Sequence, residues 1–311
     1  MSGVPRTFSR TLKGIVALDL VLETKTGLLI RMPVQAQAYR IGGADHYPMI
    51  ARKRYKFSHG AEREIEVPFI PGSSLKGRMR SLLELSLNIK LYSTDQKIWQ
   101  HVRSLSAMGL NDFHQDVISR CIIDELFGYA AVNYKQLVDE FKNVSKATDI
   151  FSQLAITRLF IDDFFPSTRY VEKIDARSIA DFVEEKSENR IDRITSAADP
   201  RDIVRVKPGV EFEGRLTLLL MDNDRDFINK YLETLATGLR LVEETYLGGS
   251  GSRGYGRVKF TSVEVKVLRI SIANGVPKLE ATNIAKKYTY LDELEKDLKN
   301  LSNEIVRALY S

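Results

Sequence analysis

The sequence predicts an α+β fold with elements in the order β-α-β-β-α-β. Four segments alternate apolar and polar residues, the pattern of strands with one buried face. Two other segments repeat apolar residues every three or four positions, as amphipathic helices do. A glycine-rich stretch joins the second of these helices to the last strand. Together these observations predict two helices packed on one face of a sheet.

The first half of this order lies between residues 12 and 164. The first strand is expected over 12–23, where Leu18, Leu20 and Leu22 share one side. The first helix is expected from Ser74, and its apolar face comprises Leu75, Met79, Leu82 and Leu83. A second strand is expected over 156–164, where charged and apolar residues alternate.

The second half repeats the pattern. A third strand is expected over 210–221 and a fourth over 255–268. The helix between them has an apolar face of Phe227, Tyr231, Leu235, Leu239 and Val242. The whole series is a ferredoxin-like or RRM-like plan. A C-terminal amphipathic helix is expected over 290–310, and we expect it to pack on its own domain.

Three long insertions interrupt this core, so residues 1–311 are expected to form a single domain with additions. The insertion at 24–69 far exceeds the usual strand-to-helix connection of about 2–6 residues, which indicates a functional excursion. The insertion at 91–150 is expected to be helical, as a lid on the core. The third insertion is 165–209.

Composition limits the class of protein. Lys and Arg number 46 against 41 for Asp and Glu, a net charge of +5, which is compatible with a nucleic-acid partner but does not require one. The single cysteine, Cys121, excludes an internal disulfide and a zinc site with several cysteines. Because no apolar run approaches the ~20 residues of a membrane span, we expect a cytoplasmic protein without membrane partners.

The glycine-rich stretch at 247–260 is the first candidate site. Glycine allows close backbone approach, so that free N–H groups can face an anion. The candidate residues are Gly248, Gly249, Gly251, Arg253, Gly254 and Gly256. Residues 253–260 also fit the RRM signature K/R-G-F/Y-G/A-F-V-x-F/Y at seven of eight positions. Because Arg257 replaces an aromatic residue of that signature, we do not expect base stacking on this strand.

The second candidate site is the turn and helix start at 70–80. A helix N-terminus with flanking basic residues is suited to phosphate. The candidate residues are Ser73, Ser74, Lys76 and Arg80. Two anion-binding elements in one chain indicate a polyphosphate ligand, most simply a nucleic acid. The densest basic cluster, at 52–56, is a further candidate for phosphate contact.

A metal site was considered at 111–116, where Asp112, His114 and Asp116 stand together with His101 upstream. Carboxylate and imidazole groups at such spacing can bind a metal. Polar residues alternate in the same way wherever a loop enters a helix, and no cysteine beside them supports zinc. We therefore favour the ordinary polar loop.

Four motifs together resemble a known family. They are IPGSSLKGRMRSLLE, TRLFIDDFF, ENRIDRITSAADPR and YLGGSGSRGYGRVKF. In this order they resemble the RAMP superfamily, and within it the repeated backbone subunit of type III CRISPR–Cas effector complexes of the III-A and III-D kinds. The resemblance implies a modified RRM core and a thumb hairpin, which corresponds here to residues 189–201.

The same resemblance implies a function and partners. It implies that protomers stack along a guide CRISPR RNA, with Lys76 and the glycine-rich loop contacting it, and that target RNA is cleaved at regular intervals with a divalent metal such as Mg²⁺ or Mn²⁺. The implied protein partners are further copies or paralogues of this chain and other type III effector subunits. One departure is Thr26-Gly-Leu-Leu29, where relatives carry a histidine after the leucine.

Asp45 is the candidate for the catalytic and metal-binding carboxylate. Relatives carry an aspartate two residues before a proline, whereas Asp45 stands three residues before Pro48, and His46 occupies the equivalent count. A one-residue insertion would leave Asp45 in the catalytic role. Otherwise the chain is a structural RNA-binding subunit that has lost cleavage. A carboxylate suits the reaction because it can act as a base or hold a cation that polarises the phosphate.

Overall fold

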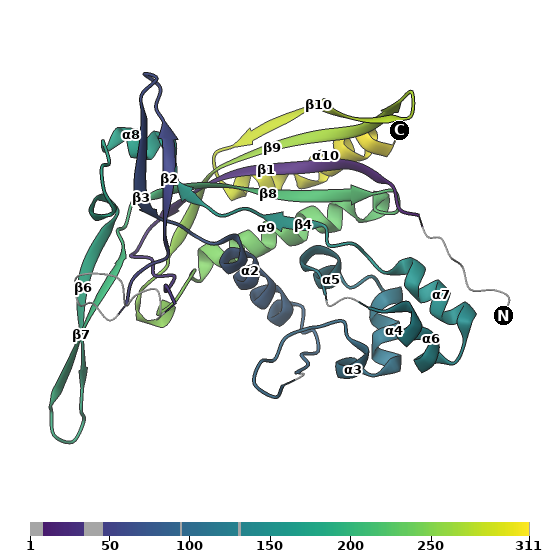
Figure 1. Ribbon diagram of the computed structural model, residues 1–311, viewed down its shortest axis with the longest axis horizontal. Coiled ribbons are helices and arrows are strands. Elements are labelled where there is room, and N and C mark those ends of the chain that lie inside the picture. The colour runs from purple at the N-terminus through teal and green to yellow at the C-terminus, as the bar shows by residue number, and fades with distance from the viewer. Residues whose placement is uncertain (1–8, 34–45, 94, 130–131, 311) are drawn as a thin grey trace.

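The computed structural model describes residues 9–33, 46–93, 95–129 and 132–310 (Figure 1). Its centre is a six-stranded antiparallel sheet in the order β10-β9-β1-β8-β4, with the short β5 also paired to β8. These strands are β1 (Leu12–Thr24), β4 (Leu159–Ile161), β5 (Phe165–Pro166), β8 (Glu211–Met221), β9 (Val258–Ala273) and β10 (Val276–Tyr288).

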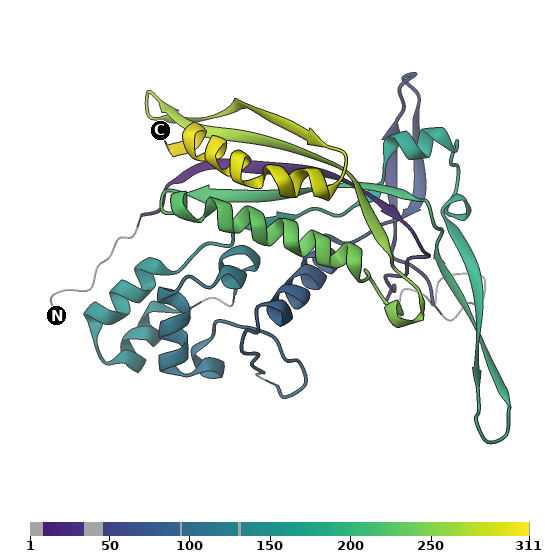
Figure 2. The same cartoon turned by 180° about the vertical axis from the view of Figure 1, so that it is seen from behind.

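Three helices cover one face of the sheet: α2 (Gly72–Ser86), α9 (Ile228–Glu244) and α10 (Leu291–Tyr310). Figure 2 shows them in front of the strands. Leu18, Leu20 and Leu22 of β1 are buried on this side, as their alternation predicts. The opposite face carries a polar row in which Asp19 of β1 binds Arg215 of β8 at 2.6 Å and lies 3.4 Å from Lys266 of β9.

The predicted mixture of helices and antiparallel strands is confirmed, with β1, α2, β4, β8, α9 and β9 in the expected chain order. The sequence did not predict the edge strand β10 of this sheet. β10 pairs with β9 through a turn at Asn274-Gly275, where φ is +54° and +76°. The second predicted strand is also much shorter than expected, because only residues 159–161 pair with β8 at that point.

The insertion at 91–150 is helical, as predicted. It contains α3 (Leu105–Met108), α4 (Leu110–Ile118), α5 (Ile122–Phe127) and α6 (Tyr134–Phe141), and α7 (Val144–Gln153) runs just beyond it. A small core joins α4, α6 and α7, and α5 packs into the main core instead. The small core is formed by Phe113, Val117, Leu137, Ala147 and Ile150. None of the helices in the described part of the chain is long and apolar enough to cross a membrane.

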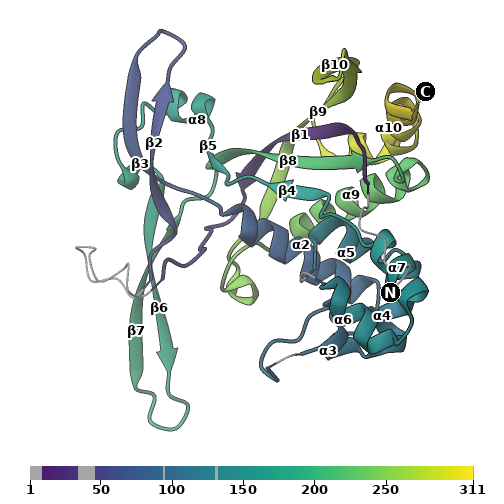
Figure 3. The same cartoon turned by 45° about the vertical axis from the view of Figure 1, so that its right-hand side comes forward.

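The other two insertions form β-hairpins at one end of the sheet (Figure 3). The first contains β2 (Ile50–Lys56) and β3 (Glu62–Pro68). The second contains α8 (Thr168–Lys173) and a long hairpin of β6 (Val183–Ile191) and β7 (Ala198–Val206), which projects away from the body of the molecule. Short 3₁₀ helices occur at Ile179–Asp181, Arg225–Phe227 and Gly251–Arg253.

Candidate nucleic-acid interface

The glycine-rich loop connects α9 to β9 and folds back against the segment that follows β1. Gly249 N donates to Leu29 O at 2.8 Å, and Gly256 N donates to Gly27 O at 2.9 Å. The loop is closed by Leu247 N, which donates to Gly256 O at 2.8 Å. Backbone hydrogen bonds therefore fix the loop beside the start of the first insertion.

The five predicted glycines fall into two groups. Three of them, Gly248, Gly251 and Gly256, are enclosed by neighbouring atoms. A Cβ at Gly256, for example, would lie 2.0 Å from Leu247 O, so glycine is required there by the packing. At Gly254 no atom lies within 4 Å of an added Cβ, and at Gly249 the nearest is 3.6 Å away. Of the five glycines, only these last two have open space beside the backbone, and their N–H groups already donate to Leu29 O and Gly251 O.

Arg253 and the outer half of the β6–β7 hairpin line an open groove. The lining residues are Glu188, Asn189, Arg190, Ile191, Arg201 and Arg253. The Arg253 side chain is 68% exposed, and its Nη1 lies 4.0 Å from Glu188 Oε2. Arg190 and Arg201 both approach Asp199, at 3.5 and 3.4 Å. Such exposed pairs are weak, so the three guanidinium groups can turn to a phosphate.

The N-terminus of α2 already has an anionic partner. Gly72 N donates to Asp163 Oδ1 at 2.7 Å, and Pro71 before it supplies no side-chain cap. A phosphate placed there would meet the Asp163 carboxylate, so this helix end is not the vacant anion site that its sequence indicates. Ser73 lies exposed and Ser74 half-buried on the first turn.

Lys76 and Arg80 lie one turn apart on α2. Lys76 Nζ donates to Leu159 O at 2.8 Å, and burial, together with the charge of Arg80, lowers the pKa of Lys76. Arg80 donates to Glu84 Oε1 at 2.7 Å and to Gly128 O at 3.0 Å. Because its guanidinium is engaged within the fold, we do not include Arg80 among the proposed RNA contacts, and the predicted contact stays a prediction.

The densest basic cluster of the sequence lies on β2, opposite the acidic strand β3. The directly opposed residues are Arg52 and Glu66, Arg54 and Glu64, and Lys56 and Glu62. The three basic side chains are exposed in one row. A row of carboxylates at cross-strand distance largely cancels their field. This hairpin is therefore not the basic phosphate-binding surface that residues 52–56 alone would indicate.

Asp45, the predicted catalytic and metal-binding residue, lies outside the described residues. The residues around the gap are described. Met32 N donates to Tyr47 O at 2.9 Å, so the chain on the two sides is joined. His46, which follows Asp45, accepts a 3.0 Å hydrogen bond at its carbonyl from Val204 N of β7. The residue after Asp45 is thus attached to the base of the β6–β7 hairpin.

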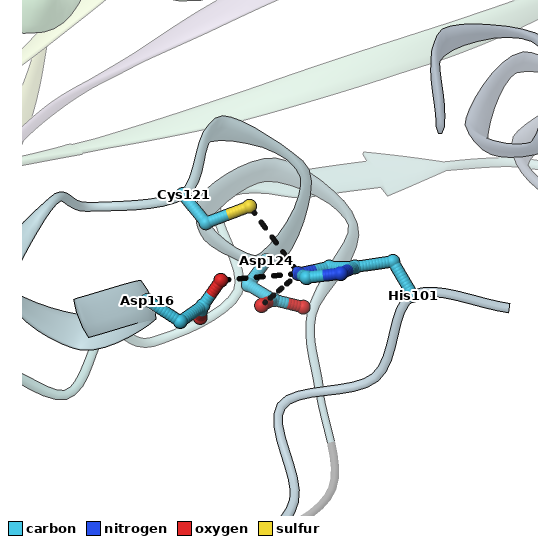
Figure 4. Close-up of side chains that lie close together, drawn as sticks. All are labelled: His101, Asp116, Cys121 and Asp124. Atoms are coloured by element: carbon cyan, nitrogen blue, oxygen red, sulfur yellow. Dashed lines mark hydrogen bonds and ion pairs between the residues drawn. The ribbon is translucent and has the colours of Figure 1, made fainter. Parts of the chain in front are cut away.

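Four potential metal ligands meet in the helical insertion (Figure 4). They are His101, Asp116, Cys121 and Asp124, and their ligand atoms all lie within 4.8 Å of one another. The sequence had instead grouped Asp112 and His114 with Asp116 and His101. Asp112 turns away to bind Lys90 at 3.0 Å, and His114 is not in the group.

The same residues form a buried charge cluster. His101 Nε2 lies 3.1 Å from both Asp116 and Asp124, and the fully buried Arg103 donates to Asp116 at 2.6 Å. Burial acts to lower the pKa of His101, but hydrogen bonds to the two carboxylates raise it to about 12. The pKa of Asp116 is lowered to about 2, against the effect of burial, mainly by its bond to His101. In this arrangement the imidazole of His101 and the guanidinium of Arg103 both lie beside the carboxylates of Asp116 and Asp124. The same group of side chains offers the imidazole, thiol and carboxylate ligands that divalent metals bind.

Comparison with known proteins identifies the family of this chain. The sequence matches the RAMP superfamily over residues 21–259.

The chain belongs to the RAMP superfamily. Two curated relatives each bear the name "CRISPR system Cms endoribonuclease Csm3". The one from Methanothermobacter thermautotrophicus is 33% identical over 243 residues, which covers 78% of this chain and 82% of the relative. The one from Methanocaldococcus jannaschii is 29% identical over 297 residues, which covers 94% of this chain and 96% of the relative.

The crystal structure of Methanopyrus kandleri Csm3 shares the fold of this RAMP protein. The two align with a TM-score of 0.51 and 18% identity, covering 94% of this chain and 98% of that chain. The resemblance predicted from the four sequence motifs is therefore confirmed at the level of the superfamily.

Sequence reasoning missed two features of this surface. One is Asp163 at the start of α2, which is separated from Gly72 by 91 positions. The other is Tyr255, which leaves the glycine-rich loop and bonds Glu188 of β6, 67 positions away. Tyr255 was predicted to begin the fourth strand, whereas β9 begins at Val258, and no local signal identifies Glu188 as its partner.

Proposed function

We propose that this RAMP protein is the guide-RNA-binding backbone subunit of a type III CRISPR–Cas complex and cleaves target RNA paired with its guide. The observation that carries the proposal is the similarity, over most of the chain, to relatives named as CRISPR endoribonucleases. The geometry supports it, because the glycine-rich loop and the flank of Asp45 both contact one hairpin near its base, and the outer half of that hairpin lines an arginine-rich groove.

The guide backbone is proposed to lie along the glycine-rich loop and α2. Arg78 of α2 donates to Tyr246 O at 3.0 Å, so the helix and the loop are adjacent. The exposed Arg253 suits a phosphate group, and the open space beside Gly249 and Gly254 allows the guide to approach the loop closely. Lys76, with Ser73 and Ser74 on the preceding turn, would extend these contacts. Such contacts carry no base information, as a subunit that accepts any guide requires.

Cleavage is proposed to depend on Asp45. Scission of RNA requires the 2′-OH to lose its proton while aligned with the scissile phosphorus, and an aspartate can act as the base. Mg²⁺ or Mn²⁺ held by the same carboxylate would polarise the phosphate. His46 fixes the neighbouring backbone to β7, which supports a link between this carboxylate and the hairpin that would distort the duplex.

The proposed partners follow from this role. They are the guide CRISPR RNA, the complementary target RNA, further copies or paralogues of this chain, and the other subunits of a type III effector complex. The cytoplasm, where guide and target transcripts meet, is the proposed location.

The test is an assay of the assembled complex with an end-labelled RNA complementary to the guide. With Mg²⁺ or Mn²⁺ added, we expect products at regular intervals, and none after chelation or with an unpaired RNA. A complex that binds the complementary RNA with nanomolar affinity but never cuts it would leave the chain as a structural subunit.

A further inference from the structure

Tyr255 belongs to the glycine-rich loop, yet its side chain is part of the hairpin. The residue is fully buried between two loop glycines, and its ring packs with Leu29 and Ile203 in an apolar cluster separate from the main core. Ile203 belongs to β7 and Leu29 follows β1. One aromatic ring therefore joins the loop, the first insertion and the β6–β7 hairpin.

The polar contacts of Tyr255 all go to one face of the hairpin. Its hydroxyl donates to Glu188 Oε1 at 2.7 Å. Lys186 Nζ lies 4.5 Å and Arg205 Cζ 4.7 Å from the ring centroid, so a cation approaches the ring from each of the two strands. Lys186 and Glu188 are two positions apart on β6, so their side chains lie on the same side of the strand.

Ion pairs within the hairpin connect the residues that surround the Tyr255 ring. Arg205 binds Glu184, the residue directly opposite it in the hairpin, at 2.8 Å, and Lys186 binds Glu188 at 2.9 Å. Arg205 also fills the space beside Gly27, where an added Cβ would lie 2.2 Å from Arg205 Nε. The hairpin base is thus held at a defined angle to the glycine-rich loop.

Beyond Glu188 the hairpin is exposed. Residues 189–191 of β6 and 198–202 of β7 all lie in solvent, and Ile194 near the tip is 93% exposed. Tyr255, with the more distant Arg253, makes the outermost contacts to the hairpin from elsewhere in the described chain. From Glu188 to Ile194 the free arm spans about 20 Å at ~3.3 Å per residue.

We propose that Tyr255 is a positioning residue for target cleavage, because it sets the angle at which the β6–β7 hairpin meets the guide–target duplex. This inference rests on the proposed function. A rotation of about 5° at the base would displace the tip by about 2 Å over that arm. Misplacement by ~1 Å is enough to slow a reaction about 100-fold when alignment of the reacting atoms is the requirement.

The first test compares Tyr255→Phe with Tyr288→Phe in the assembled complex. Tyr288 is a matched control because its hydroxyl donates to Asp297 at 2.6 Å, far from the hairpin. Tyr255→Phe should slow cleavage five- to tenfold or shift the cut positions, with guide affinity unchanged within twofold. Tyr288→Phe should leave both unchanged.

The second test measures the local stability of the hairpin and does not depend on cleavage. In the isolated chain, amide hydrogens of residues 183–206 should exchange severalfold faster in Tyr255→Phe than in the wild type or Tyr288→Phe. If the wild-type complex does not cleave, the proposed function fails, but the exchange measurement still shows whether Tyr255 holds the base of the hairpin. Unchanged exchange, wild-type cleavage by Tyr255→Phe, or a loss of guide affinity equal to the loss of cleavage would overturn the positioning role.

Discussion

Lys76 and Arg80 both lie on α2, but their different hydrogen-bond partners lead to different predictions for guide binding. Lys76→Ala should weaken guide binding about equally for guides of unrelated sequence, because a contact to phosphate does not distinguish one base from another. Loss of one such contact should reduce the slope of log affinity against log salt by about 0.7–1. Titration of several RNAs at several NaCl concentrations measures both quantities.

Arg80→Ala is the informative comparison. It removes the partner of Glu84 and of Gly128 O, which should lower the free energy of unfolding by about 1–3 kcal/mol. The salt slope of the folded protein should stay at the wild-type value, as it should for Lys230→Ala on the exposed surface of α9. Equal slope changes for Lys76→Ala and Arg80→Ala would contradict the roles assigned here.

The buried cluster around His101 leads to a stability prediction. His101→Asn removes one cation from a cluster of two carboxylates, and breaking such a buried arrangement costs about 3–5 kcal/mol of unfolding free energy. The pKa of His101 is raised on folding from 6.5 to about 12. Its contribution is therefore complete below pH 6.5 and declines as the pH rises. Urea unfolding should show a larger gap between wild type and variant at pH 6 than at pH 9.

Metal removal distinguishes a charge cluster from a metal site at the same residues. Because hydrogen bonds to the two carboxylates raise the pKa of His101, and Arg103 already pairs with the same carboxylates, a chelator should leave the melting temperature of the isolated chain unchanged. A lower melting temperature after chelation, restored by Zn²⁺, would show that His101, Asp116, Cys121 and Asp124 hold a cation instead.

Local patterns predicted some of these residues and could not predict others. The glycine-rich loop and the α2 start are contiguous motifs, so the sequence alone drew attention to Lys76 and Arg253. The partner of Arg80 at Gly128 is 48 positions away, and no spacing rule connects them. A basic residue on a helix is expected in solvent unless the fold brings an acceptor to it, and that requires the three-dimensional structure.

In the glycine-rich loop, some glycines are required by the internal packing of the protein, whereas others leave open space at the surface. Gly256→Ala should destabilise the protein strongly, because the new Cβ would collide with Leu247 O. Gly254→Ala meets no atom, and it should cost only the ~1–2 kcal/mol of a positive φ in a residue with a side chain. Thermal unfolding of both variants tests this order.

Gly254→Val extends the test to RNA. Its branched side chain would cover the open backbone, so guide affinity should fall more than the stability loss explains. Gly60→Val is the control, because Gly60 also has positive φ and open surroundings, but it lies in the β2–β3 turn. Equal losses of affinity at the two positions would contradict backbone contact at Gly254.

Some strands were predicted from the sequence and others were not, because they differ in how much of their surface is buried. β1 and β8 bury one face, so their alternation is plain in the sequence. β10 lies at the sheet edge with few buried residues, and its alternation is weak. Asn274-Gly275 is a strong hairpin signal that could have identified this strand, but the prediction did not use it. The β2–β3 hairpin was interpreted as a loop because its charged outer face obscures the buried Tyr55, Ile65 and Val67.

At the scale of the whole molecule, the proposed function requires an assembly that does not close on itself. A subunit that repeats along a guide must use two different surfaces head to tail. The chain mixed with guide RNA and its partner subunits should therefore form particles whose mass rises with guide length. Light scattering with guides of two lengths measures this, and a mass that is independent of guide length would contradict the proposal.

The central claim is that this chain itself cleaves the target. The most direct measurement is the cleavage rate of complexes built with Asp45→Ala, compared with Asp149→Ala, which removes an exposed carboxylate on α7. Asp45→Ala should abolish cleavage while guide and target affinity stay within a few-fold, because the carboxylate acts in the transition state and not in binding. Asp149→Ala should cleave like the wild type. Cleavage by Asp45→Ala at the wild-type rate and positions would contradict the account.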